Sequence, residues 1–147
     1  MLETLLKRLK PESLPADPQE QHRLAAAVLL LEIARADYEH HGAERAALRD
    51  GLVREFGVPE ATVDALLAQA EAKAKASVSL FEFVQVLNGT QSAQDKARLV
   101  GLLWDVAHAD GRVDPHEEHL LRRVADLLHV PHADFIREKL AAAERKS

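Results

Sequence analysis

The sequence contains no cysteine, few aromatic residues and no long hydrophobic run, and each absence excludes a class of protein. Without cysteine among its 147 residues, the chain has no disulfide framework, thiolate nucleophile, iron–sulfur cluster or thiolate zinc site. The longest apolar run, residues 24–31, is too short to span a bilayer. The opening MLETLLKRLK mixes charges with leucines, so we expect no secretory signal. We therefore expect a cytoplasmic protein without a transmembrane segment.

An excess of positive charge is also absent. The 19 Lys and Arg residues are outnumbered by 24 Asp and Glu residues, and they form no basic block, so nucleic acid is not an expected partner. A hydrophobic fraction of 47% with 29% charged residues is typical of folded proteins rather than disordered ones. The length suits one domain with a substantial core.

Helical periodicity recurs along the whole chain, and no segment alternates as a half-buried strand would. The sequence predicts an all-α bundle of about seven to eight helices. Residues 1–17 form an amphipathic arm with Leu2, Leu5, Leu6 and Leu9 on one face, followed by a helical domain over residues 18–147. We expect the arm to pack on its own domain; alternatives are exchange in a homodimer or contact with a membrane or a partner protein.

Capping residues, prolines and glycines divide the domain into successive helices. These begin near Asp17, Gly42, Pro59, Ser79, Ser92, Asp114 and Pro131. The helix that follows Ser92 carries a buried stripe of Leu99, Leu102, Leu103 and Val106. We also expect Trp104, Phe81 and Phe83 to be core or subdomain-contact residues rather than a ligand platform.

The two halves of the chain resemble each other. EIARADYEHHGAERAAL at 32–48 aligns with DVAHADGRVDPHEEHLL at 105–121 at a constant offset of 73, which pairs Asp37 with Asp110 and Glu44 with Glu117. FGVP at 56–59 also aligns with LHVP at 128–131 when one deletion is allowed. This pattern predicts an internal duplication of a helical hairpin.

In the second copy an apolar helix ends in Ala109-Asp110-Gly111, and Glu117 follows in the next helix. This arrangement resembles the signature of the TerB tellurite-resistance family, and the resemblance covers roughly residues 24–140. The first copy departs from it, with Tyr38 in place of the glycine and His40 in place of an apolar residue.

The resemblance implies a helical bundle of bacterial stress-response systems that binds metal through these acids and serves as a docking module. Related domains occur in a membrane-tethered J-domain co-chaperone, so the domain type implies no single pathway and no tellurite chemistry.

The four acids Asp37, Glu44, Asp110 and Glu117 are the candidate metal ligands. On one unbroken helix, residues seven apart lie roughly 10 Å from each other, too far to share an ion. A turn between two helices brings them closer, and two packed hairpins can converge all four carboxylates. Hard oxygen ligands without sulfur favour Ca²⁺ or Mg²⁺, and nothing indicates an organic cofactor.

Simpler interpretations of these acids stay open. Glu117 lies three residues after Asp114, where a capping-box acid stabilises a helix start, and Asp110 is a typical turn residue before Gly111. An EF-hand loop matches in its second half from Asp110 to Glu117, but Val106 and His108 occupy its first and third positions, where oxygen ligands are needed.

Five histidines lie within or beside the acidic motifs: His40, His41, His108, His116 and His119. Their spacing matches no known zinc motif, so we interpret them as solvated side chains, with zinc binding as the alternative. The chain also lacks a nucleophile elbow, a phosphate loop, a dinucleotide fingerprint and an HExxH pattern. We therefore expect a non-enzymatic protein that is either a metal-binding regulatory module or a metal-independent adaptor for another protein.

Overall fold

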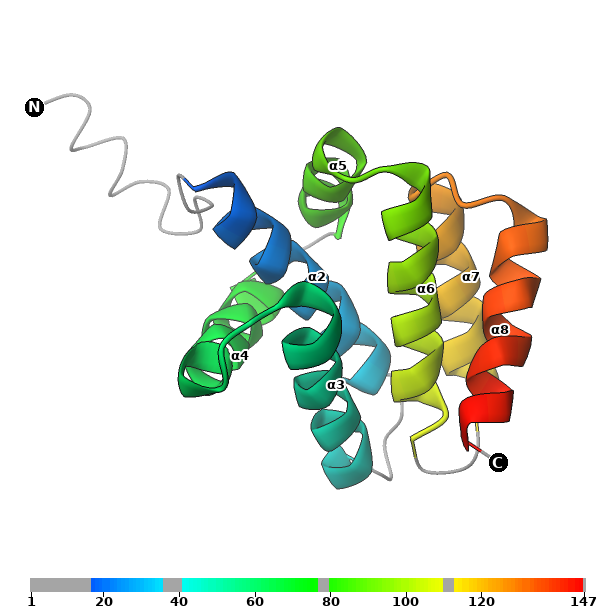
Figure 1. Ribbon diagram of the computed structural model, residues 1–147, viewed down its shortest axis with the longest axis horizontal. Helices are drawn as coiled ribbons and strands as arrows, with labels where there is room; N and C mark the ends of the chain where they lie inside the picture. Colours follow the sequence, from blue (N-terminus) through cyan, green and yellow to red (C-terminus); the bar gives the residue numbers. More distant parts are fainter. Residues whose placement is uncertain (1–16, 36–40, 77–79, 110–112, 147) are drawn as a thin grey trace, which may run out of the picture.

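The computed structural model describes residues 17–35, 41–76, 80–109 and 113–146, with the backbone only for residues 41–44 and 146. These ranges contain seven helices and no strand (Figure 1). The helices are α2 (Pro18–Arg35), α3 (His41–Phe56), α4 (Glu60–Ala76), α5 (Phe81–Thr90), α6 (Ala93–Ala107), α7 (Pro115–Leu127) and α8 (His132–Lys146). The all-α fold class predicted from the sequence is confirmed.

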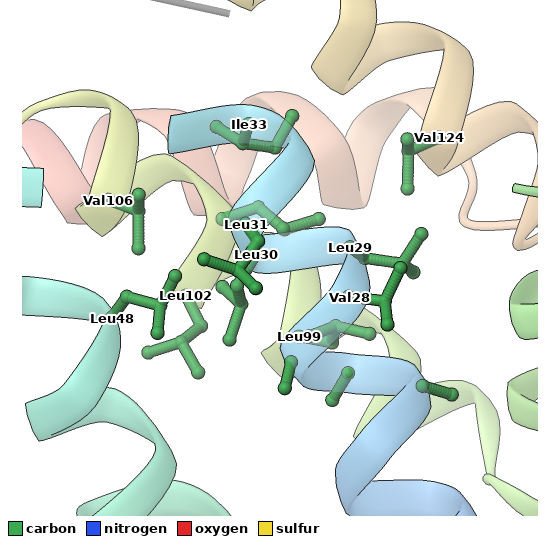
Figure 2. Close-up of a cluster of buried hydrophobic side chains, with 14 of the residues drawn as sticks. Val28, Leu29, Leu30, Leu31, Ile33, Leu48, Leu99, Leu102, Val106 and Val124 are labelled. Atoms are coloured by element: carbon green, nitrogen blue, oxygen red, sulfur yellow. The ribbon is translucent and has the colours of Figure 1, made fainter. Parts of the chain in front are cut away.

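Helix α2 forms the centre of the molecule, because it is apolar on every side. Its buried residues are Leu24, Ala25, Ala26, Ala27, Val28, Leu29, Leu30, Leu31, Ile33 and Ala34. A helix of this kind must be covered all round, and α3, α4, α5, α6 and α7 all pack against it. Figure 2 shows Leu29 on the side of Val124 of α7, and Leu30 on the side of Leu48 of α3 and Leu102 of α6.

Helix α6 is the second centre, and it contacts α2, α3, α7 and α8. Its predicted stripe of Leu99, Leu102, Leu103 and Val106 is buried, as is Trp104. Because α6 packs on both α3 and α8, these two helices flank it in Figure 1. This arrangement determines the groove described below.

The two phenylalanines of α5 differ in burial. Phe83 is fully buried, whereas Phe81 is 57% exposed. The buried face of α5 consists of Phe83, Val84 and Leu87. Phe81 is two residues before Phe83, and successive side chains turn by about 100° around a helix, so it points away from that face.

Three of the predicted helix starts are capped as expected. Asp17 Oδ1 accepts from Gln19 N at 2.9 Å, and Ser92 Oγ accepts from Asp95 N at 3.1 Å. At the third start, that of α7, Asp114 Oδ1 accepts from His116 N at 2.7 Å.

The start of α5 differs from the prediction. Its N-cap is Leu80, which provides no capping side chain, while Ser79 lies outside the described residues. The helix also continues through Gly89 to Thr90. Gly89 has the conformational freedom to stop a helix, but a glycine inside a helix is only mildly unfavourable.

The two predicted copies share a left-handed residue after the first helix. Gly57 after α3 and His129 after α7 are the only described residues with positive φ, at 63° and 61°. In each copy a buried valine and a proline come next, and then the following helix begins. The backbone hydrogen bonds differ, since Val58 N donates to Leu52 O and Val130 N to Ala125 O, and the duplication itself stays a prediction.

None of the described helices combines the length and apolar character needed to cross a membrane. Helix α2 starts at Pro18, at the predicted first residue of the helical domain, while the domain boundary itself stays a prediction. Residues 1–16 of the predicted arm lie outside the described residues, so its packing stays a prediction.

Candidate functional site

The second pair of predicted ligands falls at the connection between α6 and α7, with Asp110 between the two helices in sequence and Glu117 in the first turn of α7. Helix α6 ends at Ala107, and the backbone N–H of His108 donates to Trp104 O at 2.9 Å. Residues 110–112, which include Asp110, lie outside the described residues. The described chain resumes at Val113, two residues before α7 begins.

A complete capping box opens α7. Asp114 is the N-cap, and its Oδ1 accepts from His116 N at 2.7 Å. Glu117 Oε1 accepts in return from Asp114 N at 3.1 Å, while Pro115 occupies the first helical position. The structural interpretation of Glu117 as a capping residue is therefore confirmed.

Glu117 is also completely buried. It has 0% exposure, and Lys73 is the only other charged residue that is buried in the described part of the chain. Its position explains this, because Leu121 and Val124 follow it on the inward face of α7. An apolar stripe thus ends in a carboxylate beside the turn. Burial of a carboxylate is costly unless hydrogen bonds or a positive charge compensate for it.

An aromatic cluster connects this turn to α8. The Trp104 ring centroid lies 5.8 Å from that of His108 and 5.2 Å from that of Phe135 on α8. Lys139 Nζ lies 5.4 Å from the centroid of Trp104 and 2.6 Å from Glu118 Oε1 of α7. Helices α6, α7 and α8 therefore meet around the one tryptophan of the chain, which precedes the predicted ligand Asp110 by six residues in the sequence.

The first hairpin is described in less detail at the corresponding point. Asp37 lies outside the described residues, and Glu44 is described only as backbone within α3. The structure therefore does not test whether the four acids converge. Among the described residues alone, no group of three or more His, Asp or Glu side chains is placed to hold a metal ion.

The EF-hand alternative is inconsistent with the structure. Val106 is a fully buried core residue of α6, and His108 packs against Trp104. Neither can supply an oxygen ligand at the first or third loop position.

The histidine side chains that the structure describes do not form a zinc site. His116 and His119 are exposed, as expected for solvated side chains. His40 lies outside the described residues, and His41 is described only as backbone.

A groove, which we call the α6 groove, starts beside His108 and Ala109 and runs along α6 between α3 and α8. Its volume is about 410 Å³. Asp105 at its centre accepts from Arg145 of α8, with Oδ1 2.9 Å from Nη2, and lies 3.9 Å from Arg54 of α3. The sequence analysis missed these residues, because they come from three distant helices and no local spacing connects them.

Comparison with known proteins gives one result. The family model described as tellurite resistance protein TerB matches residues 23–140. Neither the curated proteins nor the solved structures contain a match. The matched range begins in α2, ends in α8 and includes both hairpin turns.

Proposed function

Because the chain belongs to the TerB family, we propose that it is a regulatory or docking module that binds a hard divalent cation, Ca²⁺ or Mg²⁺, through carboxylates at its hairpin turns. The proposed ligands are Asp110 and Glu117 in the second hairpin, and Asp37 and Glu44 in the first. We further propose that its partner is another protein, that it acts in a cytoplasmic stress response, and that it catalyses no reaction.

The burial of Glu117 is the observation that carries this proposal. The carboxylate lies at the end of the inward face of α7, beside the turn that contains Asp110. Its Oε1 accepts a hydrogen bond from Asp114 N, which fixes the orientation of the carboxylate. A bound cation would add positive charge beside this buried carboxylate and would favour its burial.

The available donors suit a hard cation. Carboxylate oxygens dominate both motifs, the chain has no thiolate, and the nearby His116 and His119 are exposed. This donor set favours Ca²⁺ or Mg²⁺ over zinc. The described residues alone are too few for a site, so the proposal requires acids from the turns.

Isothermal titration calorimetry with Ca²⁺ and Mg²⁺ tests the proposal on the full chain. We expect the wild type to bind and the double variant Asp110→Asn/Glu117→Gln to lose binding. Glutamine can still accept from Asp114 N, so the capping box should survive the change. A matched control, Asp126→Asn/Glu60→Gln, removes the same charge from exposed positions on α7 and α4. Absence of both heat and a thermal shift in the wild type would end the proposal.

The complete capping box supports a second candidate, a metal-independent adaptor for another protein. In that case Glu117 serves only to stabilise the start of α7, and a chelator should leave the melting temperature unchanged. Asp114→Ala and Glu117→Ala should then destabilise the protein by similar amounts, about 1–2 kcal/mol each, since both break the same box. If Glu117 binds a cation instead, added Ca²⁺ or Mg²⁺ should raise the melting temperature of Asp114→Ala but not that of Glu117→Ala.

A further inference from the structure

A second cavity, distinct from the hairpin turns, lies where the start of α2, the end of α3 and the start of α6 meet. Its volume is about 220 Å³, against about 30 Å³ for one water molecule in the liquid. Phe56 and Leu99 give it an apolar part, and the other lining side chains are polar or charged. The cavity therefore has room for a molecule of several heavy atoms.

The walls of this cavity are held in place by the fold. Arg23 of α2 donates from Nε to Phe56 O at 3.1 Å and from Nη2 to Gly57 O at 3.0 Å, which ties α2 to the end of α3. Glu55 is engaged by Arg54, with 3.2 Å between Oε1 and Nε. The backbone N–H of the lining residue Asp95 donates to Ser92 Oγ at 3.1 Å, which caps the start of α6. These interactions satisfy several of the polar groups at the cavity without any ligand.

Two buried polar atoms at the cavity are not satisfied. His22 Nε2 and Gln91 Oε1 are shielded from solvent and have no hydrogen-bond partner among the described residues. Buried polar atoms in native proteins nearly always have a partner. Burial lowers the pKa of His22 from its ordinary value of 6.5, and the negative charge of Asp95 opposes this shift. A neutral imidazole offers one donor and one acceptor.

The cavity lining also contains one acidic and one basic side chain of α6. Asp95 and Arg98 are three residues apart on α6, and neither forms an ion pair with another residue of the described ranges. A ligand with a single charge would be attracted by one of them and repelled by the other. A ligand that carries both charges complements the two together.

We propose that this cavity binds a small zwitterion, a free α-amino acid, with its carboxylate at Arg98, its ammonium at Asp95, and its polar side chain at His22 and Gln91. Guanidinium–carboxylate and ammonium–carboxylate contacts are the stronger class of hydrogen bond, and they would fix the orientation of the ligand. His22 and Gln91 would then favour a side chain that both donates and accepts, such as a carboxamide. The site involves none of the proposed metal ligands.

Titration of the full-length ¹⁵N-labelled protein in EDTA with glycine, L-glutamine, acetate or methylammonium at equal millimolar concentrations tests this site. We expect both amino acids to shift the Gln91 side-chain amide and the His22 imidazole resonances in a saturable way, with L-glutamine binding more tightly than glycine. Acetate and methylammonium should bind at least about tenfold more weakly, because each makes only one of the charged contacts.

Variants provide the second arm of the test. Asp95→Asn and Arg98→Gln should each weaken L-glutamine binding by about tenfold or more, while Asp126→Asn and Arg123→Gln on the exposed face of α7 should not. All four replace exposed side chains, so the fold should persist, and melting temperatures verify this. The proposal is overturned if acetate or methylammonium alone binds as well as the amino acids. It is equally overturned if no probe shifts Gln91 and His22, which would leave ordered water as the only occupant.

Discussion

Gly57 and His129 have the same left-handed backbone conformation, with φ of 63° and 61°, at equivalent turns of the two hairpins. Glycine adopts this conformation without strain, whereas a residue with a Cβ pays about 1–2 kcal/mol for it. The two residues therefore share a backbone conformation but differ in strain.

Substitutions at these turns should change stability in opposite directions. We expect His129→Gly to raise the free energy of unfolding by about 0.5–1 kcal/mol, because His129 is exposed and loses little packing. Gly57→Ala should lower it by about 1 kcal/mol. Urea denaturation measures both.

Gly89→Ala is the control for this comparison. Gly89 lies in α5 with open space around it, and helical alanine should stabilise the protein by about 0.5–1 kcal/mol. If Gly57→Ala stabilised the protein as much as Gly89→Ala, the left-handed assignment of that turn would be incorrect.

Gly51 of α3, which faces α6, and Gly101 of α6, which faces α8, should differ in their tolerance of a methyl group. A Cβ on Gly51 of α3 would lie 2.5 Å from Cδ1 of the buried Leu102, so Gly51→Ala should cost about 1–3 kcal/mol through overpacking. On Gly101 of α6 it would meet only the end of the flexible Glu138 side chain, also at 2.5 Å. That carboxylate can move aside, so Gly101→Ala should change stability by less than about 1 kcal/mol. Thermal denaturation of the two variants tests this difference. Equal destabilisation by both would contradict the close packing of α3 on α6.

The burial of His22 predicts a pH dependence. Because burial lowers its pKa in the folded state below 6.5, the fold favours neutral imidazole, and this contribution to stability is fully present above pH 6.5. It is lost as the pH falls below that value toward the folded-state pKa. Between about pH 7.5 and 5, the wild type should lose stability relative to His22→Gln. As a control, replacing the exposed His119 with glutamine should leave the pH dependence of the wild type in place. Parallel curves of stability against pH for the wild type and His22→Gln would contradict the prediction.

Three helix starts were predictable because local chemistry determines them. Asp17, Ser92 and Asp114 cap their helices as their sequence contexts indicate. The apolar stripe of α6 and the unusually apolar run of α2 likewise follow from residue spacing alone. The equivalence of Gly57 and His129 was already implied by the FGVP and LHVP motifs.

Features that depend on distant contacts were not predictable from the chain. Phe81 has the same apolar character as Phe83, and only the packing of α5 on α2 decides which of them is exposed. The meeting of Arg54, Asp105 and Arg145 likewise requires the placement of three helices. At the candidate site, the capping role of Glu117 was predicted, and its complete burial came from the structure.

Terbium luminescence sensitised by Trp104 is the most direct test of cation binding at the hairpin turn. The tryptophan is the only one in the chain, and its ring lies 5.8 Å from that of His108, two residues before Asp110. A Tb³⁺ ion held by Asp110 and Glu117 should therefore emit on tryptophan excitation, saturate at a fixed stoichiometry and be displaced by Ca²⁺. Asp110→Asn/Glu117→Gln should abolish this emission, and Asp126→Asn/Glu60→Gln should preserve it. No sensitised emission from the wild type, or equal emission from the Asp110→Asn/Glu117→Gln variant, would contradict the account.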